Sequence, residues 1–537
     1  MKKIICILTI AAIAFSSCTK WLDINNNPNV GQEDDPTADQ RLAPIISQFV
    51  DGYESAGTRA GVITQQLATI YSTSLAAYHL SRWNSTAATS AIAGWPWQSW
   101  YVNTAVNLQP MIKAAQQVDA WHYVGVAKVI RAWGFGYMSD YYGMLPYDEF
   151  DDPAVLTPKF DDGAYVQAKV LALLDEGIAD LQKTQGPAAP ALSKGDILHG
   201  GSASDWIKTA YALKARFLLH TSKKADFNPQ AVLDVLANAP KTDDESAIMQ
   251  YVDESPASST VQAALQYVNI NNNYRPTKLF IDYLTNNYTG APSGAANMED
   301  PRAAIMIPSA TNADGILVRS EGVDMASDLP KSGPAAGDTR FVTLRKSPVA
   351  PKPGDKIVST GSWYTQRGGK GLLLTNAEMR FIEAEMLFRQ GKTGEALTAY
   401  KAGIRSHMTI MSIPADSINK FLASTSVAQT AGQLTMSLIM IQKWIALSYS
   451  PEAWMDMRRM NFCTDAGGNY NEAAGIYKGF KRPSHVMPEG YPNPTDWPRR
   501  CAVPSYEVNY NLQQVLAANP NASNPTYMAE PVWWDKP

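Results

Sequence analysis

Apolar residues recur at helical spacing along most of the chain. In one segment they fall at intervals of three and four residues, which places Trp206, Ala210, Leu213 and Phe217 on one face of a helix. Asp205 precedes this stripe as the expected N-cap. Two later segments repeat the spacing: Ala377, Phe381, Ala384 and Phe388, and Leu434, Leu438, Ile441 and Ile445. The pattern predicts a mostly α-helical protein.

Residues 375–407 predict a helical hairpin. A Thr375-x-x-Glu378 capping box opens the first helix, and a Gln-Gly-Lys break at residues 390–392 separates it from a second stripe. The spacing is that of a tetratricopeptide repeat, which places small residues where its two helices approach and an aromatic ring between them. The matching residues are Ala384, Ala396 and Tyr400, with Gly403 in place of the usual third alanine.

Strand signals are scarce, and long irregular segments separate the helical blocks. Two short alternating runs, residues 315–319 and 340–344, predict one minor hairpin. Residues 183–204, 285–371 and 464–498 are rich in Gly, Pro, Ser and Asn. Because tryptophans and tyrosines occur within loops of this length, we expect these loops to carry function.

The first residues form a targeting signal. Lys2 and Lys3 precede a 12-residue apolar run at 4–15, and Ser16 and Ser17 precede Cys18. The run is too short to span a bilayer, and small residues directly before a cysteine are typical of a bacterial lipoprotein signal. Phe15 departs from the aliphatic residue usual at its position. We expect cleavage after residue 17 and a lipid on Cys18, with ordinary secretion as the alternative.

Charge and cysteine content narrow the function classes. The chain has 46 Lys and Arg against 50 Asp and Glu, a net charge of −4, and no basic stripe, which argues against nucleic acid as a partner. Apolar residues make up 45% of the 537 residues, which is enough for a large core. Cys463 and Cys501 can pair or remain as two buried thiols, and no Cys or His spacing indicates a metal.

Familiar catalytic motifs are absent from the sequence. The six histidines lie far apart, and there is no nucleophile elbow, phosphate loop or dinucleotide fingerprint. Acidic residues do cluster, at Asp148, Glu149, Asp151, Asp152, Asp161 and Asp162. Two opposed carboxylates can hydrolyse a glycosidic bond, so a helical glycoside hydrolase is an alternative function, although solvated loop acids explain the cluster more simply.

Tryptophans and amides near the N-terminal third favour recognition of a sugar. Trp83 adjoins Asn84, and Trp95 and Trp97 flank Pro96, which predicts a loop there. Flat rings can stack on sugar faces while amide side chains bond hydroxyls. The alternative is that these rings fill a junction between helices, the role we expect for Trp100.

A second aromatic set lies in or beside the long central loops. Tyr274 and Arg275 follow an asparagine run at residues 271–273, and Trp363 and Tyr364 stand beside Gln366. The sequence supports a place in a ligand site and a structural role equally for each of these residues.

Short motifs run from residues 21–29 through the block 442–459 to residues 504–511, and together they resemble the SusD/RagB family of nutrient-binding outer-membrane lipoproteins of Bacteroidetes. The start of the mature chain at residues 21–29 is similar to that family, and the block around residues 442–459 is the most specific match. Further matches are residues 140–147, 206–219, 300–302, 372–385, 498–500 and 504–511.

The resemblance implies one α-helical body with about four tetratricopeptide-like helix pairs and a ligand site on irregular loops. It implies a signal peptide at residues 1–17, a lipidated tether at 18–39 and a nutrient-binding domain at 40–537. It further implies surface exposure on the outer membrane, an oligosaccharide or peptide ligand, a SusC-like TonB-dependent transporter as partner, and no catalysis, cofactor or metal. The matching motifs identify the scaffold and leave the ligand and its contacts open.

Three functions therefore stand to be distinguished. The first is nutrient capture for a transporter, and the second is a lipid-anchored glycoside hydrolase. The third is a pure protein scaffold, which predicts that Trp83, Trp95 and Trp97 are all buried.

Overall fold

The computed structural model describes residues 36–71, 76–85, 90–252, 274–311, 314, 316–327, 329–330, 340–344, 359–366 and 368–537. Cys18, the predicted signal peptide and most of the predicted tether lie outside these ranges. The first described helix begins at Ala38, so the last two residues of the predicted tether are helical. None of the described helices is both long and apolar enough to cross a membrane.

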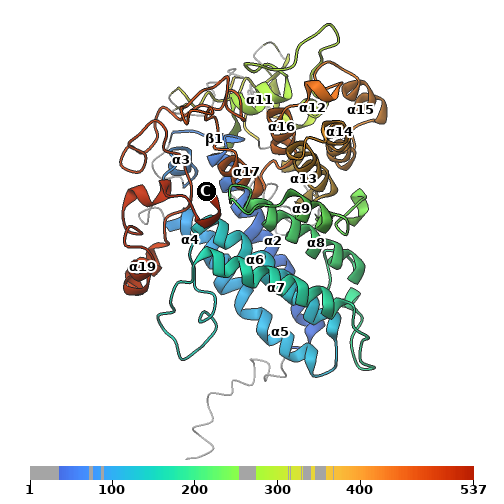
Figure 1. The fold of residues 1–537 in the computed structure, drawn as a ribbon, viewed down its shortest axis with the longest axis vertical. Helices are drawn as coiled ribbons and strands as arrows, with labels where there is room; N and C mark the ends of the chain where they lie inside the picture. Colours follow the sequence, from blue (N-terminus) through green and yellow to red (C-terminus); the bar gives the residue numbers. More distant parts are fainter. Residues whose placement is uncertain are drawn as a thin grey trace, which may run out of the picture.

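Helices form the body of the molecule (Figure 1). The first half packs around the long helix α2 and occupies the lower part of Figure 1. Its helices are α2 (Ala38–Ile63), α3 (Ala76–Ser81), α4 (Ser90–Gln98), a π-helical segment (Ser99–Ala105), α5 (Val106–Gln116), α6 (Trp121–Tyr142), α7 (Gly163–Leu181), α8 (Ala203–His220) and α9 (Pro229–Leu236).

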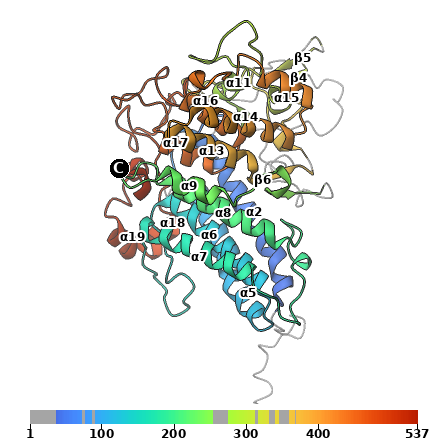
Figure 2. The ribbon, with the colours of Figure 1, turned by 45° about the vertical axis from the view of Figure 1, so that its right-hand side comes forward.

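The second half forms the upper part of the molecule, and the C-terminal segment returns to the first half (Figures 1 and 2). Its helices are α11 (Lys278–Leu284), α12 (Ala303–Met306), α13 (Asn376–Arg389), α14 (Thr393–Ile410), α15 (Ala415–Leu422), α16 (Met436–Ala446), α17 (Glu452–Arg459), α18 (Ser505–Tyr510) and α19 (Leu512–Ala518). Consecutive helices pack as pairs, α6 with α7, α8 with α9, α13 with α14 and α16 with α17. The mostly α, repeat-like architecture predicted from the sequence is confirmed.

The predicted hairpin at residues 375–407 is the pair α13 and α14. A Cβ built on Gly403 would lie 2.9 Å from the Phe381 ring, so the absence of a side chain lets the two helices approach. Thr375 caps α13 as predicted, because its hydroxyl accepts the Glu378 N–H. The Glu378 carboxylate does not complete the capping box and instead pairs with Arg216 of α8.

Two local predictions were wrong. Helix α8 is capped by Ser202, whose hydroxyl accepts the N–H of Asp205, so Asp205 lies in the first turn. Pro96 lies inside α4, which runs directly into the π-helical segment, so it ends no helix there. One missing backbone bond is outweighed by the burial of large rings such as Trp97 and Trp100 on the inner side of this helix.

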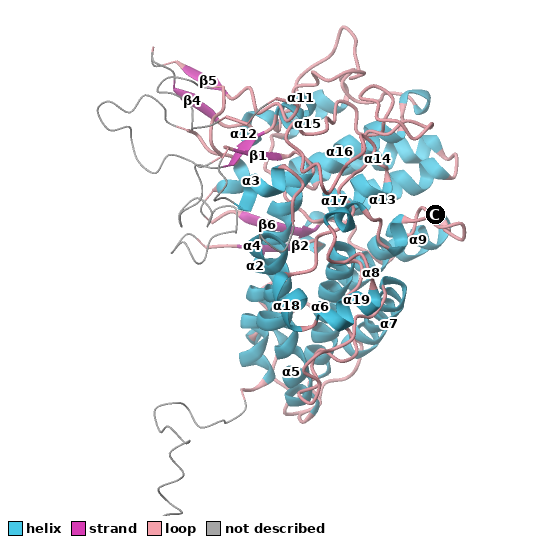
Figure 3. Ribbon diagram, turned by 90° about the vertical axis from the view of Figure 1, so that its left-hand side faces the viewer, coloured by secondary structure: helices cyan, strands magenta, loops and turns pink. Residues whose placement is uncertain are grey.

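The strands are short and lie along one side of the molecule (Figure 3). They form three antiparallel pairs: β1 (Leu67–Thr69) with β3 (Tyr274–Pro276), β2 (Ala247–Gln250) with β6 (Lys370–Leu374), and β4 (Ser309–Thr311) with β5 (Leu317–Arg319). The predicted hairpin between residues 315–319 and 340–344 was wrong in its pairing, since β5 pairs with β4. Residues 340–344 still lie close, because the Arg340 carbonyl accepts the N–H groups of Glu321 and Gly322.

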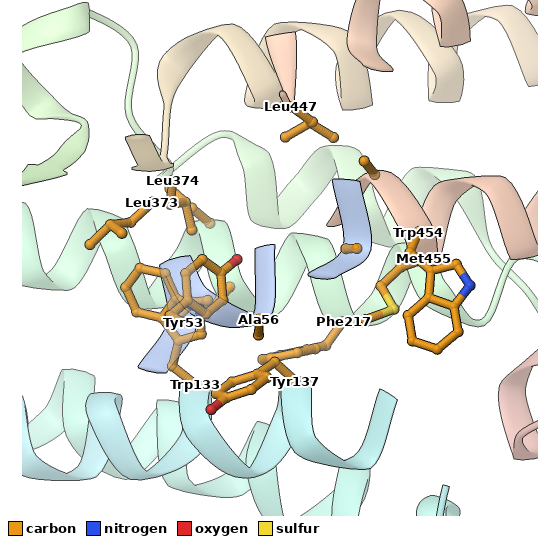
Figure 4. Close-up of a cluster of buried hydrophobic side chains, with 14 of the residues drawn as sticks. Tyr53, Ala56, Trp133, Tyr137, Phe217, Leu373, Leu374, Leu447, Trp454 and Met455 are labelled. Carbon is orange, nitrogen blue, oxygen red and sulfur yellow. The ribbon is translucent and has the colours of Figure 1, made fainter. Parts of the chain in front are cut away.

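Aromatic rings fill the core where the two halves meet (Figure 4). The Tyr53 ring of α2 lies edge-on to Trp133 and Tyr137 of α6, with centroids 5.3 and 5.5 Å apart. Phe217 of α8 and Trp454 of α17 point into the same region (Figure 4). Because these rings come from helices far apart in sequence, their burial joins both halves into one body.

Candidate functional site

The short strands and central loops build one face of the molecule, which we call the loop face. It comprises β1 with residues 70–71, α3 with Arg82, β3, and residues 320–327, 329–330, 340–344 and 481–487. Thr69 pairs with Tyr274, and Thr277 bridges to Val323, so three stretches that are distant in sequence meet here. A small separate core supports them, formed by Ala68, Tyr78, Val323, Met325 and Leu329, with Phe341 packed against it.

Tyr71 presents the most exposed aromatic ring of the loop face. Its side chain is 47% exposed, while Tyr78 beneath it is only 5% exposed. The two rings meet edge to face at 4.9 Å, and the Tyr71 N–H donates to the Pro330 carbonyl at 2.8 Å. The inner side of Tyr71 is therefore fixed by Tyr78 and Pro330, and the outer side of its ring is accessible to solvent.

Basic and imidazole groups surround this tyrosine pair. The Arg82 guanidinium lies 5.9 Å from the centre of the Tyr78 ring, and the His485 imidazole is parallel to that ring at 6.3 Å. Arg82 also donates to the His485 carbonyl at 2.9 Å, which fixes the segment around residue 485 to the end of α3. Burial raises the pKa of Tyr78, so its hydroxyl stays protonated at neutral pH.

A groove of about 530 Å³ also opens on the loop face, and neither Tyr71 nor Tyr78 is among its lining residues. Its wall includes Pro330, the residue that Tyr71 contacts, and the Phe341 ring. Polar groups line the rest, among them Asp324 and Arg340. The volume falls within the range of small-molecule sites, and the mixture of ring and polar groups suits a polyhydroxylated ligand.

Some of the residues predicted as ligand contacts come together at the edge of the loop face. The Tyr274 carbonyl accepts the Leu344 N–H at 3.1 Å, and the Leu344 carbonyl accepts the Thr365 hydroxyl at 2.7 Å. This chain of bonds brings Tyr274 near the pair Trp363 and Tyr364. Tyr274 and Trp363 are half-buried and retain accessible surface.

Arg275 and Tyr364 point inward. Arg275 is 2% exposed, and its burial lowers its pKa to about 10. Tyr364 is 5% exposed and bonds through its hydroxyl to the His407 Nε2 atom at 3.2 Å. The Tyr364 ring lies edge-on to Trp363 with centroids 4.9 Å apart, whereas Arg275 donates to the Tyr274 carbonyl.

Trp83 is packed in the core, and Asn84 beside it is half-buried. The centroid of the Trp83 ring lies 5.5 Å from that of Tyr491 and 5.8 Å from that of Trp497. The backbone carbonyl of Trp83 accepts a hydrogen bond from the Tyr491 hydroxyl. Trp83 adopts a φ of 57°, a left-handed conformation that is uncommon for a bulky residue. The ring therefore fixes the end of α3 to the C-terminal loops.

Trp95 and Trp97 separate on opposite sides of α4. Trp97 is 3% exposed and lies against Tyr101, Tyr142 and Phe160, with ring centroids 4.8, 5.0 and 5.9 Å away. Trp95 is 39% exposed, and α4 contacts α3, the helix that carries Tyr78. Of Trp83, Trp95 and Trp97, only Trp95 exposes its ring to solvent. The scaffold hypothesis predicted that all three are buried, and this is correct for Trp83 and Trp97 only.

The clustered acidic residues at 148–162 mostly bond backbone N–H groups within their own loop. Asp161 accepts the N–H groups of Tyr147 and Asp148 at 3.1 Å each, and Asp162 caps α7. Glu149 accepts the N–H of Lys159 at 3.0 Å. Asp152 accepts the N–H of Ala154, and Asp151 lies 3.8 Å from Arg131. None of these acids lines the groove of the loop face.

One buried group of side chains has the composition of a metal site. Asp140, His220 and Glu452 place their oxygen and nitrogen atoms within 4.8 Å of one another. His220 uses both ring nitrogens, with Nδ1 3.1 Å from Asp140 and Nε2 2.9 Å from Glu452. Burial lowers its pKa, but the two carboxylates outweigh this and raise it to about 9. With the imidazole protonated, the three side chains form a buried ion network.

The two remaining cysteines are separate buried thiols. Cys463 donates to the Asn471 carbonyl at 2.9 Å, and burial raises its pKa to about 11. Burial likewise raises the pKa of Cys501 to about 12. Of the two alternatives that the sequence left open, the structure shows the unpaired thiols.

The central residues of the loop face were not among those predicted from sequence. Tyr71 and Tyr78 are separated by a Ser/Thr-rich stretch that resembles an ordinary helix connection. His485 and Phe341 lie hundreds of residues away from them in the chain. The available signal was the pair of tyrosines on either side of residues 72–77, and this pair does not indicate which distant residues contact it.

Comparison with known proteins identifies the fold. A SusD-like family model, described as starch-binding and associating with the outer membrane, matches residues 34–476. None of the curated proteins matches the chain.

Several solved structures share the fold. A SusD/RagB family protein from Bacteroides thetaiotaomicron is 19% identical, with a TM-score of 0.67 over 93% of this chain and 99% of the other. A chitin-binding SusD homologue from Flavobacterium johnsoniae is 18% identical, with a TM-score of 0.67 over 92% and 98%. A SusD homologue from Bacteroides fragilis is 17% identical, with a TM-score of 0.64 over 93% and 100%.

Proposed function

Because the chain belongs to the SusD-like family of starch-binding proteins that associate with the outer membrane, we propose that it captures an oligosaccharide on the loop face. We further propose that it passes this ligand to a SusC-like TonB-dependent transporter. The proposal assigns a binding role, without bond cleavage.

The observation that carries the proposal is the position of Tyr71. Its ring is 47% exposed, rests edge-on against the buried Tyr78, and stands at Pro330 on the wall of the groove. A ring that is already fixed loses little conformational entropy when a sugar stacks on it, so more of the contact energy is retained as affinity.

The groove supplies hydrogen-bonding groups, which ring stacking alone does not provide. Asp324 and Arg340 line it and can accept and donate hydrogen bonds to ligand hydroxyls. The half-buried rings of Tyr274 and Trp363 lie at the edge of the same face and offer further surface to a longer chain. The exposed Trp95 on α4 is a candidate contact at the other edge.

The ligand class follows from the chemistry and from one relative. The Flavobacterium homologue is described as chitin-binding, and rings combined with polar groups suit a neutral glycan in the same way. A peptide is the alternative ligand, and the binding experiment below includes it as an outcome.

The attachment to the membrane is part of the proposal. Cleavage after residue 17 would leave Cys18 as the first residue, carrying lipid as the anchor, with a short tether before the domain that begins near residue 40. Mass spectrometry of the N-terminal peptide from the native membrane tests this, since a lipidated Cys18 has a mass far above that of the unmodified peptide.

The binding role is tested by calorimetric titration of the purified protein with neutral oligosaccharides and with oligopeptides. We expect an oligosaccharide to bind, Tyr71→Ala to weaken it about tenfold, and Tyr510→Ala, at a tyrosine 83% exposed on α18, to leave it unchanged. Intact ligand after prolonged incubation is expected. Cleavage products would favour the hydrolase, and binding of peptides alone would refute the glycan assignment.

A further inference from the structure

A second pocket lies away from the loop face, among the upper helices. It is formed by the loop after α11, by the connection between α15 and α16, and by Lys478, and it has a volume of about 290 Å³. In Figure 1 these elements lie in the upper part of the molecule, where α11, α15 and α16 are labelled. None of its lining residues belongs to the groove described above.

Lys478 gives this pocket a positive charge. No aspartate or glutamate lines it, and among the described residues no carboxylate lies within ion-pair distance of the Lys478 ammonium. The nearby Lys481 differs, because it lies 3.5 Å from Asp324. An ammonium with no counter-ion in the described part of the chain, beside a partly enclosed pocket, favours a ligand with negative charge.

Neutral hydrogen-bonding groups surround this charge. The Thr425 hydroxyl oxygen is buried and has no hydrogen-bond partner among the described residues. The side-chain carbonyl of Gln433 accepts the N–H groups of Gln429 and Thr430, which leaves its NH₂ group as a donor. Thr435, the N-cap of α16, also lines the wall, so the positive end of the helix dipole adds to the field of Lys478.

An aromatic ring completes the wall. Tyr288 is half-buried and fixed by edge contact with Tyr283, with centroids 5.0 Å apart. Pro292 and Leu438 extend the apolar surface. A ring beside hydroxyl and amide groups suits a sugar, and the volume, at the lower end of ligand sites, suits a single sugar unit.

We propose that this pocket binds one acidic sugar unit, a uronate, with its carboxylate on Lys478 and its hydroxyls on Thr425 and Gln433. The site is independent of the loop face and adds a preference for acidic sugars to the binding of a neutral glycan. The carboxylate chemistry is shared by a free uronate and by a uronate at the end of a glycan.

Calorimetric titration with glucuronate, galacturonate, glucose and inorganic phosphate tests the proposal on the purified protein. We expect a uronate to bind more tightly than glucose and phosphate, and more weakly as the ionic strength rises. Lys478→Gln should weaken uronate binding about tenfold or more, and Thr425→Val should weaken it less. Lys420→Gln, at an exposed lysine of α15 that does not line the pocket, is the matched control and should bind as the wild type does.

Thermal melting of each variant separates loss of the site from loss of the fold. The proposal is overturned if neither uronate binds at millimolar concentration, if Lys478→Gln binds uronate like the wild type while folded, or if phosphate binds as tightly as the uronates. A uronate-terminated oligosaccharide that binds more tightly than the free sugar would assign the pocket to glycan ends, and equal affinity would assign it to the monosaccharide. Neutral glycan binding at Tyr71 should persist in Lys478→Gln. A failure of the uronate proposal would therefore leave the loop-face proposal intact.

Discussion

The guanidinium of Arg459 and the carboxylate of Glu385 form a fully buried two-point ion pair, with both N···O distances at 2.9 Å. The pair joins α17 to α13, and Asp456 also accepts from Arg459 while pairing with Lys443 at 2.8 Å. Burial alone would raise the pKa of Glu385, yet Arg459 and Arg389 hold it well below its usual range. The most specific sequence block of the chain is therefore a charged network inside the helical scaffold.

Removing the negative partner of this pair should destabilise the protein strongly. Glu385→Gln leaves the Arg459 charge buried with one carboxylate fewer, and we expect a loss of about 3–5 kcal/mol in the free energy of unfolding. Glu383→Gln is the control on the same helix, because Glu383 is 30% exposed and pairs with Arg380 near the surface. It should cost less than about 1 kcal/mol, as measured by urea unfolding. Equal losses in the two variants would show that the network has no special role.

His220 predicts a decline in stability above neutral pH. Its pKa is about 9 in the folded protein and 6.5 in the unfolded chain, so the folded state retains a proton that the unfolded state releases. The contribution of His220 to stability should be complete below pH 6.5 and fall by about 2 kcal/mol by pH 8. Lys223, whose pKa burial lowers to about 8, acts in the opposite sense above that pH, so the test stops there.

Urea unfolding at pH 6.5 and pH 8 measures this decline. The difference between the wild type and His220→Gln isolates His220, because burial lowers the pKa of His122, His199 and His407, and these groups act in the opposite sense in both proteins. Equal changes in stability over this interval in the wild type and in His220→Gln would mean that His220 is neutral in the folded protein.

Close approach of α6 to the π-helical segment depends on a glycine. A methyl group at Gly134 would overlap the Trp100 ring, so Gly134→Ala should destabilise the protein by about 1–3 kcal/mol despite the better helix propensity of alanine. Gly394, in the first turn of α14, has no atom within 4 Å of such a methyl group. Gly394→Ala should leave thermal stability unchanged or raise it slightly. Similar melting temperatures for both variants would contradict this packing.

The two tryptophans of α4 should respond differently to truncation. Trp97→Ala removes a fully packed ring and should cost about 3–5 kcal/mol of stability, whereas Trp95→Ala should cost less than about 1 kcal/mol. Chemical unfolding followed by oligosaccharide titration of each folded variant measures both effects. A large loss of stability in Trp95→Ala would place that ring in the core and remove it from the candidate site.

Helices could be predicted from the sequence because their apolar spacing is a local property. The pair α13 and α14 was predicted with its cap at Thr375 and its close contact at Gly403. The same local reasoning failed at Pro96, because the burial of Trp97 and Trp100 depends on α6 and on residues near 160, which no local pattern reveals.

The site was harder to predict than the fold for the same physical reason. Tyr71 owes its position to Tyr78, Pro330 and the strand pair β1 and β3, which join segments more than 200 residues apart. An aromatic residue next to an amide side chain in the sequence, such as Trp83, can pack in a core as well as it can bind a ligand. Only tertiary contacts decide between these roles, and they place Trp83 inside.

The central claim, that the loop face captures a neutral oligosaccharide, is tested most directly by amide hydrogen exchange with and without the ligand. Binding at this face predicts slower exchange in residues 65–71, 274–277, 320–330 and 481–487, and unchanged exchange in the acidic loop at 146–162. Protection of the acidic loop instead, or no protection around Tyr71 at saturating ligand, would contradict the account.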